Sequence, residues 1–258
     1  MERVRRAAAL ALLALSLSCA PQAQPLPLPE QLISLASDEG ARLLLKSDAR
    51  RAYWPLSIQF VTQKNQAYCG VATMVMVLNA LAIKAPPAPG LEPFATFTQD
   101  NVLNEQTERI LPQAALARRG MTLDQLAGLL ETHDVSVEVR HADQSSLDEF
   151  RAAAIKHLRA ANRHVVVNYL RRAIGQESGG HISPLAAYDA ESDRFLILDV
   201  SRYKYPPAWV KAVDLFAAMN TVDSDNNNRR RGFVLISPRA ISEEPAQRER
   251  SQEVPAPR

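Results

Sequence analysis

The stretch QFVTQKNQAYCGVATMVMVLNAL, residues 59–81, passes from a polar loop into an apolar run that contains no proline. A cluster rich in Pro and Gly follows at 86–90. This pattern predicts a helix that begins at Cys69 and ends near Leu81. Because free backbone N–H groups and the helix dipole favour negative charge at a helix start, we expect Cys69 to form a nucleophilic thiolate.

The cysteine count supports a chemical role for Cys69. The chain has two cysteines, and if Cys19 is removed or lipidated, Cys69 has no intramolecular partner for a disulfide. A buried cysteine that acts as a small hydrophobic side chain is the alternative. Gln63 lies six residues before Cys69, a spacing that would bring its side-chain amide back beside the sulfur to donate to a tetrahedral oxyanion.

Five histidines compete for the role of general base. Four lie near the ends of predicted helices, where a cation is favoured, or beside predicted strands, and are expected to be structural: His133, His157, His141 and His164. His181 differs because it follows two glycines and opens the strand-like segment HISPLAAYD. We expect its ring to face a cleft and to serve as the base.

Asp199 is the candidate partner of His181. It ends the apolar run FLILDV, where a buried carboxylate needs a partner that a histidine on the neighbouring antiparallel strand would supply. Asp189 and Asp193 lie in a polar turn and are expected to be solvated. A nucleophile, a base, an orienting carboxylate and an oxyanion donor are thus each assigned to a residue.

Helix patterns dominate the first half of the chain and strand patterns the second. A first helix is expected to be interrupted near Gly40, and capping boxes that begin at Thr122 and Ser146 predict two further helices. Apolar, β-branched runs predict strands at 135–139, 165–170, 195–200 and 233–237. This segregation predicts an α+β fold with an antiparallel sheet rather than alternating βαβ units.

Composition is ordinary for a globular domain, with 47% hydrophobic and 22% charged residues. The net charge of +2, from 30 basic and 28 acidic residues, gives no field that would favour nucleic acid. Residues 1–20 have a basic start, an apolar run of about ten residues and then small residues, the layout of a secretory signal that is too short to span a membrane. We therefore expect an exported protein, periplasmic or lipid-anchored at the cell envelope.

The ends of the chain suggest the domain boundaries. Cys19 stands where a bacterial lipoprotein signal carries its lipidated cysteine, but Ser16 replaces the usual Leu, so lipidation and plain cleavage nearby both stay open. We expect a signal peptide over 1–23, a Pro-rich linker over 24–30, one domain over 31–239 and a disordered tail over 240–258.

Three stretches carry a resemblance to a known family: residues 59–81 quoted above, GGHISPLAAYDAESDRFLILDVSRYKYPPAWV (179–210) and RRRGFVLIS (229–237). They resemble the catalytic domain of phytochelatin synthases, and the similarity extends with gaps from about residue 38 to residue 237. The resemblance implies a papain-like fold in which Cys69, His181 and Asp199 form a catalytic triad and Gln63 is the oxyanion donor.

The resemblance also implies a reaction, that of a glutathione γ-glutamylcysteinyltransferase. Cys69 would attack the amide between γ-glutamylcysteine and glycine in glutathione, and glycine would leave. The thioester would then pass its acyl group to water or to a second glutathione, which gives a phytochelatin that chelates heavy metals in detoxification.

Partners and cofactors follow from the same resemblance. No tightly bound cofactor and no protein metal site are expected, and cadmium or zinc would enter as thiolate complexes of glutathione. Glutathione is the expected small-molecule partner. Contact with a membrane is expected only through an N-terminal lipid anchor, and the oligomeric state stays open, a homodimer included.

Two further residues are assigned by the resemblance. Arg231 is the family's arginine beside the cleft and would pair with a substrate carboxylate through its planar fork, and Gly180 would line the substrate site. The alternatives are a solvated basic turn at 229–231 and a simple strand-entry glycine. The chain has no cysteine after Cys69 and so resembles short bacterial members, in which glutathione cleavage is expected to compete with chain extension.

Two rival functions stay open. The same four roles would serve an exported cysteine peptidase or amidase that acts on cell-envelope peptides. A non-catalytic binding lipoprotein would keep the fold but leave Cys69 no more reactive than an ordinary thiol.

Overall fold

The structure, a computed structural model, describes residues 25–177 and 179–239. The predicted signal peptide with Cys19 and the predicted tail over 240–258 lie outside the described residues. Residues 25–30 form neither helix nor strand, and the Leu26 N–H donates to the Lys204 carbonyl at 2.8 Å. Within the described ranges, no helix has both the length and the apolar character that crossing a bilayer requires.

One sheet of seven strands, in the order β1-β6-β5-β4-β3-β7-β2, organises the described part of the chain. Every neighbouring pair in it is antiparallel. The strands are β1 (Ile33–Ser34), β2 (Val135–His141), β3 (His164–Leu170), β4 (Gly180–Asp189), β5 (Arg194–Ile197), β6 (Ala208–Lys211) and β7 (Gly232–Pro238). The predicted α+β fold with an antiparallel sheet is confirmed.

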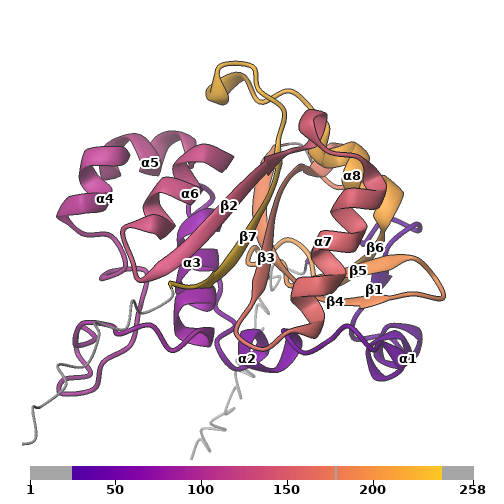
Figure 1. The fold of residues 1–258 in the computed structure, drawn as a ribbon, viewed down its shortest axis with the longest axis horizontal. Helices are drawn as coiled ribbons and strands as arrows, with labels where there is room; N and C mark the ends of the chain where they lie inside the picture. Colours follow the sequence, from indigo (N-terminus) through magenta and orange to yellow (C-terminus); the bar gives the residue numbers. More distant parts are fainter. Residues whose placement is uncertain (1–24, 178, 240–258) are drawn as a thin grey trace, which may run out of the picture.

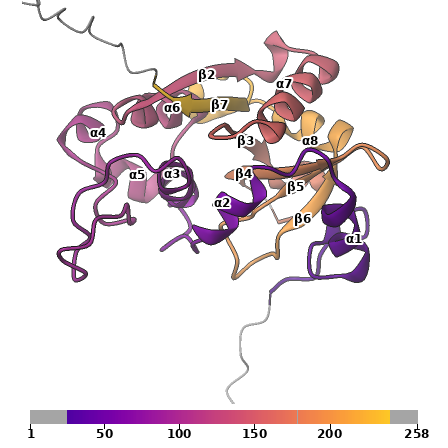
Figure 2. The same ribbon diagram turned by 60° about the horizontal axis from the view of Figure 1, so that its bottom comes forward.

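Helices cover the sheet from two sides. Figure 1 shows α3 to α6 gathered on one side of the strands and α7 and α8 on the other, and Figure 2 shows the same division after rotation. The helices are α1 (Asp38–Lys46), α2 (Tyr53–Ile58), α3 (Cys69–Ala80), α4 (Glu105–Ile110), α5 (Gln113–Arg119), α6 (Leu123–Glu131), α7 (Leu147–Arg159) and α8 (Ala212–Met219), with short 3-10 turns at η1 (Ala142–Gln144), η2 (Arg171–Ile174) and η3 (Ser224–Asn226).

Helix α3 is the buried axis of the molecule. Every residue from Cys69 to Leu78 is buried, which an amphipathic surface helix would not allow but an all-apolar one does. Its start at Cys69 confirms the prediction from the sequence. The capping boxes predicted at Thr122 and Ser146 are also present, each with its side chain accepting from the third residue of the helix.

Several local predictions were wrong. Gly40 does not interrupt a helix but lies inside α1, where an added Cβ would stand 2.0 Å from the Ser34 carbonyl oxygen, so its lack of a side chain permits close packing. The strand predicted over 195–200 ends at Ile197, which leaves Asp199 in the loop beyond it. Five short elements, α2, α4, α5, α8 and β6, carried no prediction from the sequence.

Candidate active site

Cys69 is the first residue of α3, and no side chain caps this end of the helix. The first N–H groups of α3 are therefore available to a ligand, as at any uncapped helix start. The thiol is free of any disulfide, and the residue is 8% exposed. Thr73, one turn further along, donates its hydroxyl to the Ile182 carbonyl at 3.2 Å, which ties α3 to the strand that carries His181.

His181 is the second residue of β4 and pairs with Tyr169 of β3 in the sheet register. The two rings pack edge to face, with centroids 5.7 Å apart and planes at 85°. This packing fixes the plane of the imidazole. His181 Nε2 lies 2.9 Å from Ser183 Oγ and 2.8 Å from Asp199 Oδ1, so this nitrogen faces the carboxylate and the other ring nitrogen is left for the thiol.

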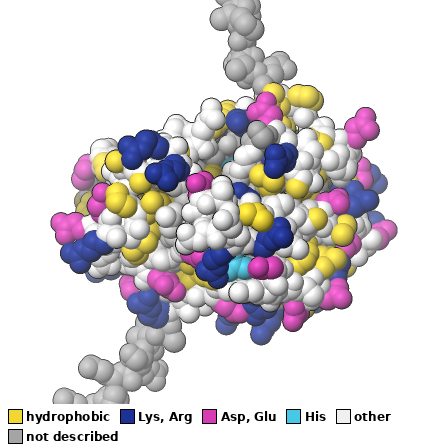
Figure 3. Space-filling model, turned by 90° about the horizontal axis from the view of Figure 1, so that it is seen from above, with side chains coloured by type: hydrophobic (Ala, Val, Ile, Leu, Met, Phe, Trp, Pro, Cys, Tyr) yellow, Lys and Arg dark blue, Asp and Glu magenta, His cyan; other side chains and the backbone are white. Residues whose placement is uncertain are grey.

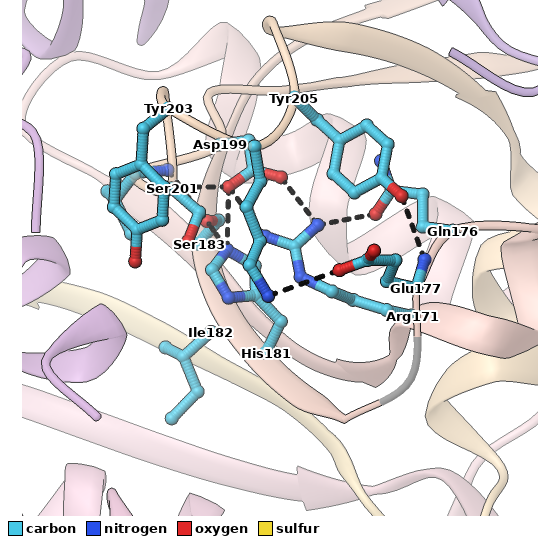
Figure 4. Close-up of polar contacts among 12 residues, drawn as sticks. Arg171, Gln176, Glu177, His181, Ile182, Ser183, Asp199, Ser201, Tyr203 and Tyr205 are labelled. Carbon is cyan, nitrogen blue, oxygen red and sulfur yellow. Dashed lines mark hydrogen bonds and ion pairs between the residues drawn. The ribbon is translucent and has the colours of Figure 1, made fainter. Parts of the chain in front are cut away.

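Asp199 lies two residues beyond β5, where the chain leaves the sheet. Its Oδ1 accepts from the Ser201 N–H at 2.8 Å and from Arg171 Nη2 at 2.8 Å, in addition to the contact with His181. Figure 4 shows the carboxylate between the imidazole of His181 and the guanidinium of Arg171. The expected contact between the buried Asp199 carboxylate and His181 is present, and Arg171 is a second partner that the sequence did not predict.

The three buried groups set one another's charge. Burial raises the pKa of the Cys69 thiol, but the hydrogen bond to His181 and the charge of that ring outweigh it and bring the pKa below its ordinary value. Burial likewise lowers the pKa of His181, but the Asp199 carboxylate outweighs it and raises the pKa. Burial would raise the pKa of Asp199, yet His181 and Arg171 hold it well below its usual range. These shifts favour a thiolate beside an imidazolium and an ionised Asp199.

A cavity of about 380 Å³ opens beside Cys69 and His181. Its walls combine apolar residues of the α4–α6 region with polar groups from the sheet and from the loop before β7: Ile110, Leu111, Pro112, Ala115, Met121, Gln125, Asn168, Gly180, Asp223, Asp225 and Arg231 are among them. A cleft of this size, lined by both polar and apolar groups, suits a small-molecule ligand that carries polar groups. Seen from the top of Figure 1, acidic and basic side chains are interspersed around a central hollow (Figure 3).

Arg231 lies in the wall of this cavity and is 8% exposed, so it is no solvated basic turn. Its guanidinium donates to Thr221 Oγ1 at 3.1 Å and to the Val222 carbonyl at 2.5 Å, and lies 3.3 Å from Asp223 Oδ1. Its Nε is buried and has no hydrogen-bond partner among the described residues. Gly180 lies against it: an added Cβ would stand 3.4 Å from Arg231 Nε and Nη2.

Gln63 is buried close to the site, but its amide is already engaged. Nε2 donates to the Asn65 carbonyl at 2.6 Å and to the Tyr203 hydroxyl at 3.0 Å, and Oε1 is buried without a partner in the described ranges. Its backbone N–H donates to the Val200 carbonyl at 2.9 Å, which joins the loop before α3 to the loop of Asp199. The oxyanion role of Gln63 stays a prediction.

The other histidines lie away from the cavity. Burial lowers the pKa of both His133 and His157, which disfavours the charged ring that was expected to interact with a helix end. His141 lies between Asp124 Oδ1, at 3.0 Å from Nε2, and the Arg230 carbonyl, at 2.5 Å from Nδ1. These contacts join α6 to the strand pair β2–β7.

Sequence reasoning also missed two buried charged groups. Asp189, expected to be solvated, is 3% exposed and accepts from the N–H and hydroxyl of Ser192. Arg171 is 3% exposed and directly follows the strand VVVNYL, a position that suggests a buried partner. Among the described residues, no group of three or more His, Cys, Asp or Glu side chains could hold a metal ion.

Comparison with known proteins relates this chain to one family. The family model described as phytochelatin synthase matches residues 23–233. The chain is 36% identical over 210 residues to "Glutathione gamma-glutamylcysteinyltransferase 3" of Lotus japonicus and 36% identical over 208 residues to "Glutathione gamma-glutamylcysteinyltransferase 2" of Arabidopsis thaliana. Each match covers 80% of this chain, but 42% and 44% of the plant proteins.

A yeast relative with the same kind of name matches at lower sequence identity. "Glutathione gamma-glutamylcysteinyltransferase" of Schizosaccharomyces pombe is 28% identical over 218 residues, which are 83% of this chain and 51% of that protein. The chain thus spans about half or less of the length of these relatives. On the extent of the family match and the identity to the plant proteins, the chain belongs to the phytochelatin synthase family.

Proposed function

We propose that this chain is a cysteine-dependent glutathione γ-glutamylcysteinyltransferase. The observation that carries the proposal is that Cys69 and His181 line a cavity that also holds Arg231, while Asp199 contacts His181 from behind. The names of the curated relatives support glutathione as the substrate. The order of roles is that of nucleophile, base and orienting acid in acyl transfer.

In the first half-reaction the Cys69 thiolate attacks the carbonyl carbon between the cysteine and glycine of glutathione. The oxyanion that forms would accept from N–H groups at the uncapped start of α3, with Gln63 as a second donor if its amide turns toward the cavity. The C–N bond breaks as His181 gives its proton to the glycine nitrogen, and a γ-glutamylcysteinyl thioester remains on Cys69.

In the second half-reaction neutral His181 removes a proton from the acceptor. Water as the acceptor gives γ-glutamylcysteine, and the α-amino group of a second glutathione gives an extended peptide. In either case the C–S bond of the thioester breaks and the Cys69 thiol is restored. Cadmium or zinc would act as part of the substrate, since soft ions bind glutathione thiolates.

Arg231 is proposed to bind a carboxylate of the donor glutathione. Its buried Nε–H is without a hydrogen-bond partner in the described part of the chain, and burial of such a donor is costly unless a ligand accepts from it. Gly180 supports this role because it leaves the space beside Nε empty of side chain.

The test is incubation of the purified full chain with glutathione, with and without cadmium, with products resolved by mass spectrometry. The matched control is Cys69→Ser, which keeps the side-chain size and removes the thiolate. We expect glycine release by the wild-type protein and an intact mass raised by one γ-glutamylcysteinyl group when the reaction is quenched in acid. Neither signal is expected from the variant.

The products separate the acceptors. Glycine and γ-glutamylcysteine alone would mean transfer to water, and longer peptides would mean transfer to glutathione. Folded wild-type protein that releases no glycine under either condition, or equal release by Cys69→Ser, would refute the proposal. Incubation of the protein with a panel of cell-envelope peptides, with cleavage followed by mass spectrometry, would then test the peptidase alternative.

A further inference from the structure

Arg171 lies behind the carboxylate of Asp199, on the side opposite His181 (Figure 4). Its Nη2 donates to Oδ1 at 2.8 Å. Its Nη1 lies 2.8 Å from Oδ2 in an ion-pair contact, without the geometry of a hydrogen bond. Since Oδ1 also receives His181 and the Ser201 N–H, Arg171 supplies the positive charge nearest to Oδ2.

Arg171 is itself held in place. Nη1 donates to Gln176 Oε1 at 2.5 Å, and the guanidinium lies 5.4 Å from the centroid of the Tyr205 ring. The Tyr205 hydroxyl in turn accepts from the Glu177 N–H at 2.9 Å. A planar guanidinium fixed on three sides orients a carboxylate more strictly than a lysine ammonium would.

Arg171 offsets the cost of burying the Asp199 carboxylate. A carboxylate that is 2% exposed is costly without an opposite charge. His181 supplies that charge only as an imidazolium, and in the proposed reaction it gives up its proton in each cycle. Without Arg171, Asp199 would hold that proton on His181 and would stand as an unpaired buried anion whenever the ring is neutral.

We propose that Arg171 is a positioning residue that acts through Asp199: it fixes the carboxylate and balances its charge in both protonation states of His181, which lets the imidazolium release its proton to the leaving amine. This inference rests on the proposed function. The charge of Arg171 also lowers the pKa of His181 and of Cys69. The lower pKa of His181 likewise favours release of its proton.

The test compares Arg171→Met, Arg171→Lys and the matched control Arg172→Met, which removes an exposed charge from the same η2 turn. The first readout is the rate of Cys69 alkylation by iodoacetamide between pH 4 and 9, followed on the peptide that contains Cys69. For Arg171→Met we expect the acid limb of this profile to move to higher pH by about one unit or more. Arg171→Lys keeps the charge, so the acid limb of its alkylation profile should lie at the same pH as in the wild type. The same is expected of Arg172→Met.

The second readout is steady-state glutathione cleavage. Loss of the planar fork in Arg171→Lys is expected to lower kcat by ~10- to 100-fold through misplacement of the imidazole, with KM within about twofold of wild type. If circular dichroism shows that Arg171→Met does not fold, the inference is tested by Arg171→Lys alone, through the comparison of its kcat and its KM with those of the wild type.

Two results would overturn the inference. One is an unchanged acid limb in folded Arg171→Met, and the other is an Arg171→Lys variant whose KM rises while kcat is kept, which would make Arg171 a substrate ligand. Alkylation needs no glutathione, so a shifted limb in a protein that does not cleave glutathione would support Arg171 and refute only the proposed function.

Discussion

His164, the first residue of β3, offers a test of how burial controls charge in this core. The residue is 1% exposed, and neither ring nitrogen has a hydrogen-bond partner among the described residues. Burial, together with the neighbouring His157, lowers its pKa from 6.5 to about 4. The folded protein therefore keeps His164 neutral over a range in which the unfolded chain binds a proton.

This difference makes the folded state less stable as the pH falls. The folded pKa is lower than the unfolded one, so stability is undiminished above pH 6.5 and is lost as the pH falls from 6.5 toward 4. Each pKa unit corresponds to about 1.36 kcal/mol. The loss due to His164 is about 2 kcal/mol between pH 7 and 5 and approaches about 3 kcal/mol below pH 4.

The assay is urea unfolding, followed by circular dichroism, of the wild type and His164→Leu at pH 7, 6 and 5. Other titrating groups are shared, so the difference between the two pH dependences isolates His164. We expect the free energy of unfolding to fall by about 2 kcal/mol more in the wild type than in the variant from pH 7 to 5. Parallel losses in the two proteins would refute the reasoning.

Two glycine substitutions make further predictions. Gly232→Ala would place a Cβ 2.1 Å from the Arg140 carbonyl oxygen and should lower the free energy of unfolding, measured in urea, by about 3 kcal/mol or more. The control Gly128→Ala, inside α6 and 3.4 Å from the nearest side chain, should change it by less than about 1 kcal/mol. Equal effects of the two substitutions would show that the close contact of β7 with β2 at Gly232 does not limit stability. Gly180→Ala should leave the unfolding transition unchanged but cover the Nε–H of Arg231, which would raise KM for glutathione by roughly 10-fold through loss of a charge-assisted hydrogen bond; an unchanged KM would argue against Arg231 as a carboxylate ligand.

The parts of the site that the sequence predicted well are those with a local signal. The apolar run after Cys69 predicts a buried helix, and the structure starts that helix at Cys69, as predicted. His181 is marked by the glycines before it and Asp199 by the apolar residues around it, and the antiparallel pairing of β4 with β5 brings their strands together.

Arg171 could not be assigned in this way because its partner is distant in sequence. In the sequence it is one of two consecutive arginines after a strand, and the pairing of β3 with β4 and of β4 with β5 brings it beside Asp199. Gly40 misled for the opposite reason: glycine weakens a helix locally, but here the contact of α1 with Ser34 requires a residue without Cβ. At Gly40, local helix propensity yields to tertiary packing.

The place of β7 in the sheet has a consequence for biosynthesis. This strand is the last described element of the chain, yet it lies inside the sheet, between β3 and β2. Synthesis from the N-terminus therefore delivers Cys69 first and the strand that closes the sheet last. Until the ribosome has passed residue 238, β2 lacks the strand with which it pairs, and the loop that carries Arg231 has no following strand to hold it in the cavity wall. The wall of the cavity that holds Arg231 is thus completed after Cys69, His181 and Asp199 have all been synthesised.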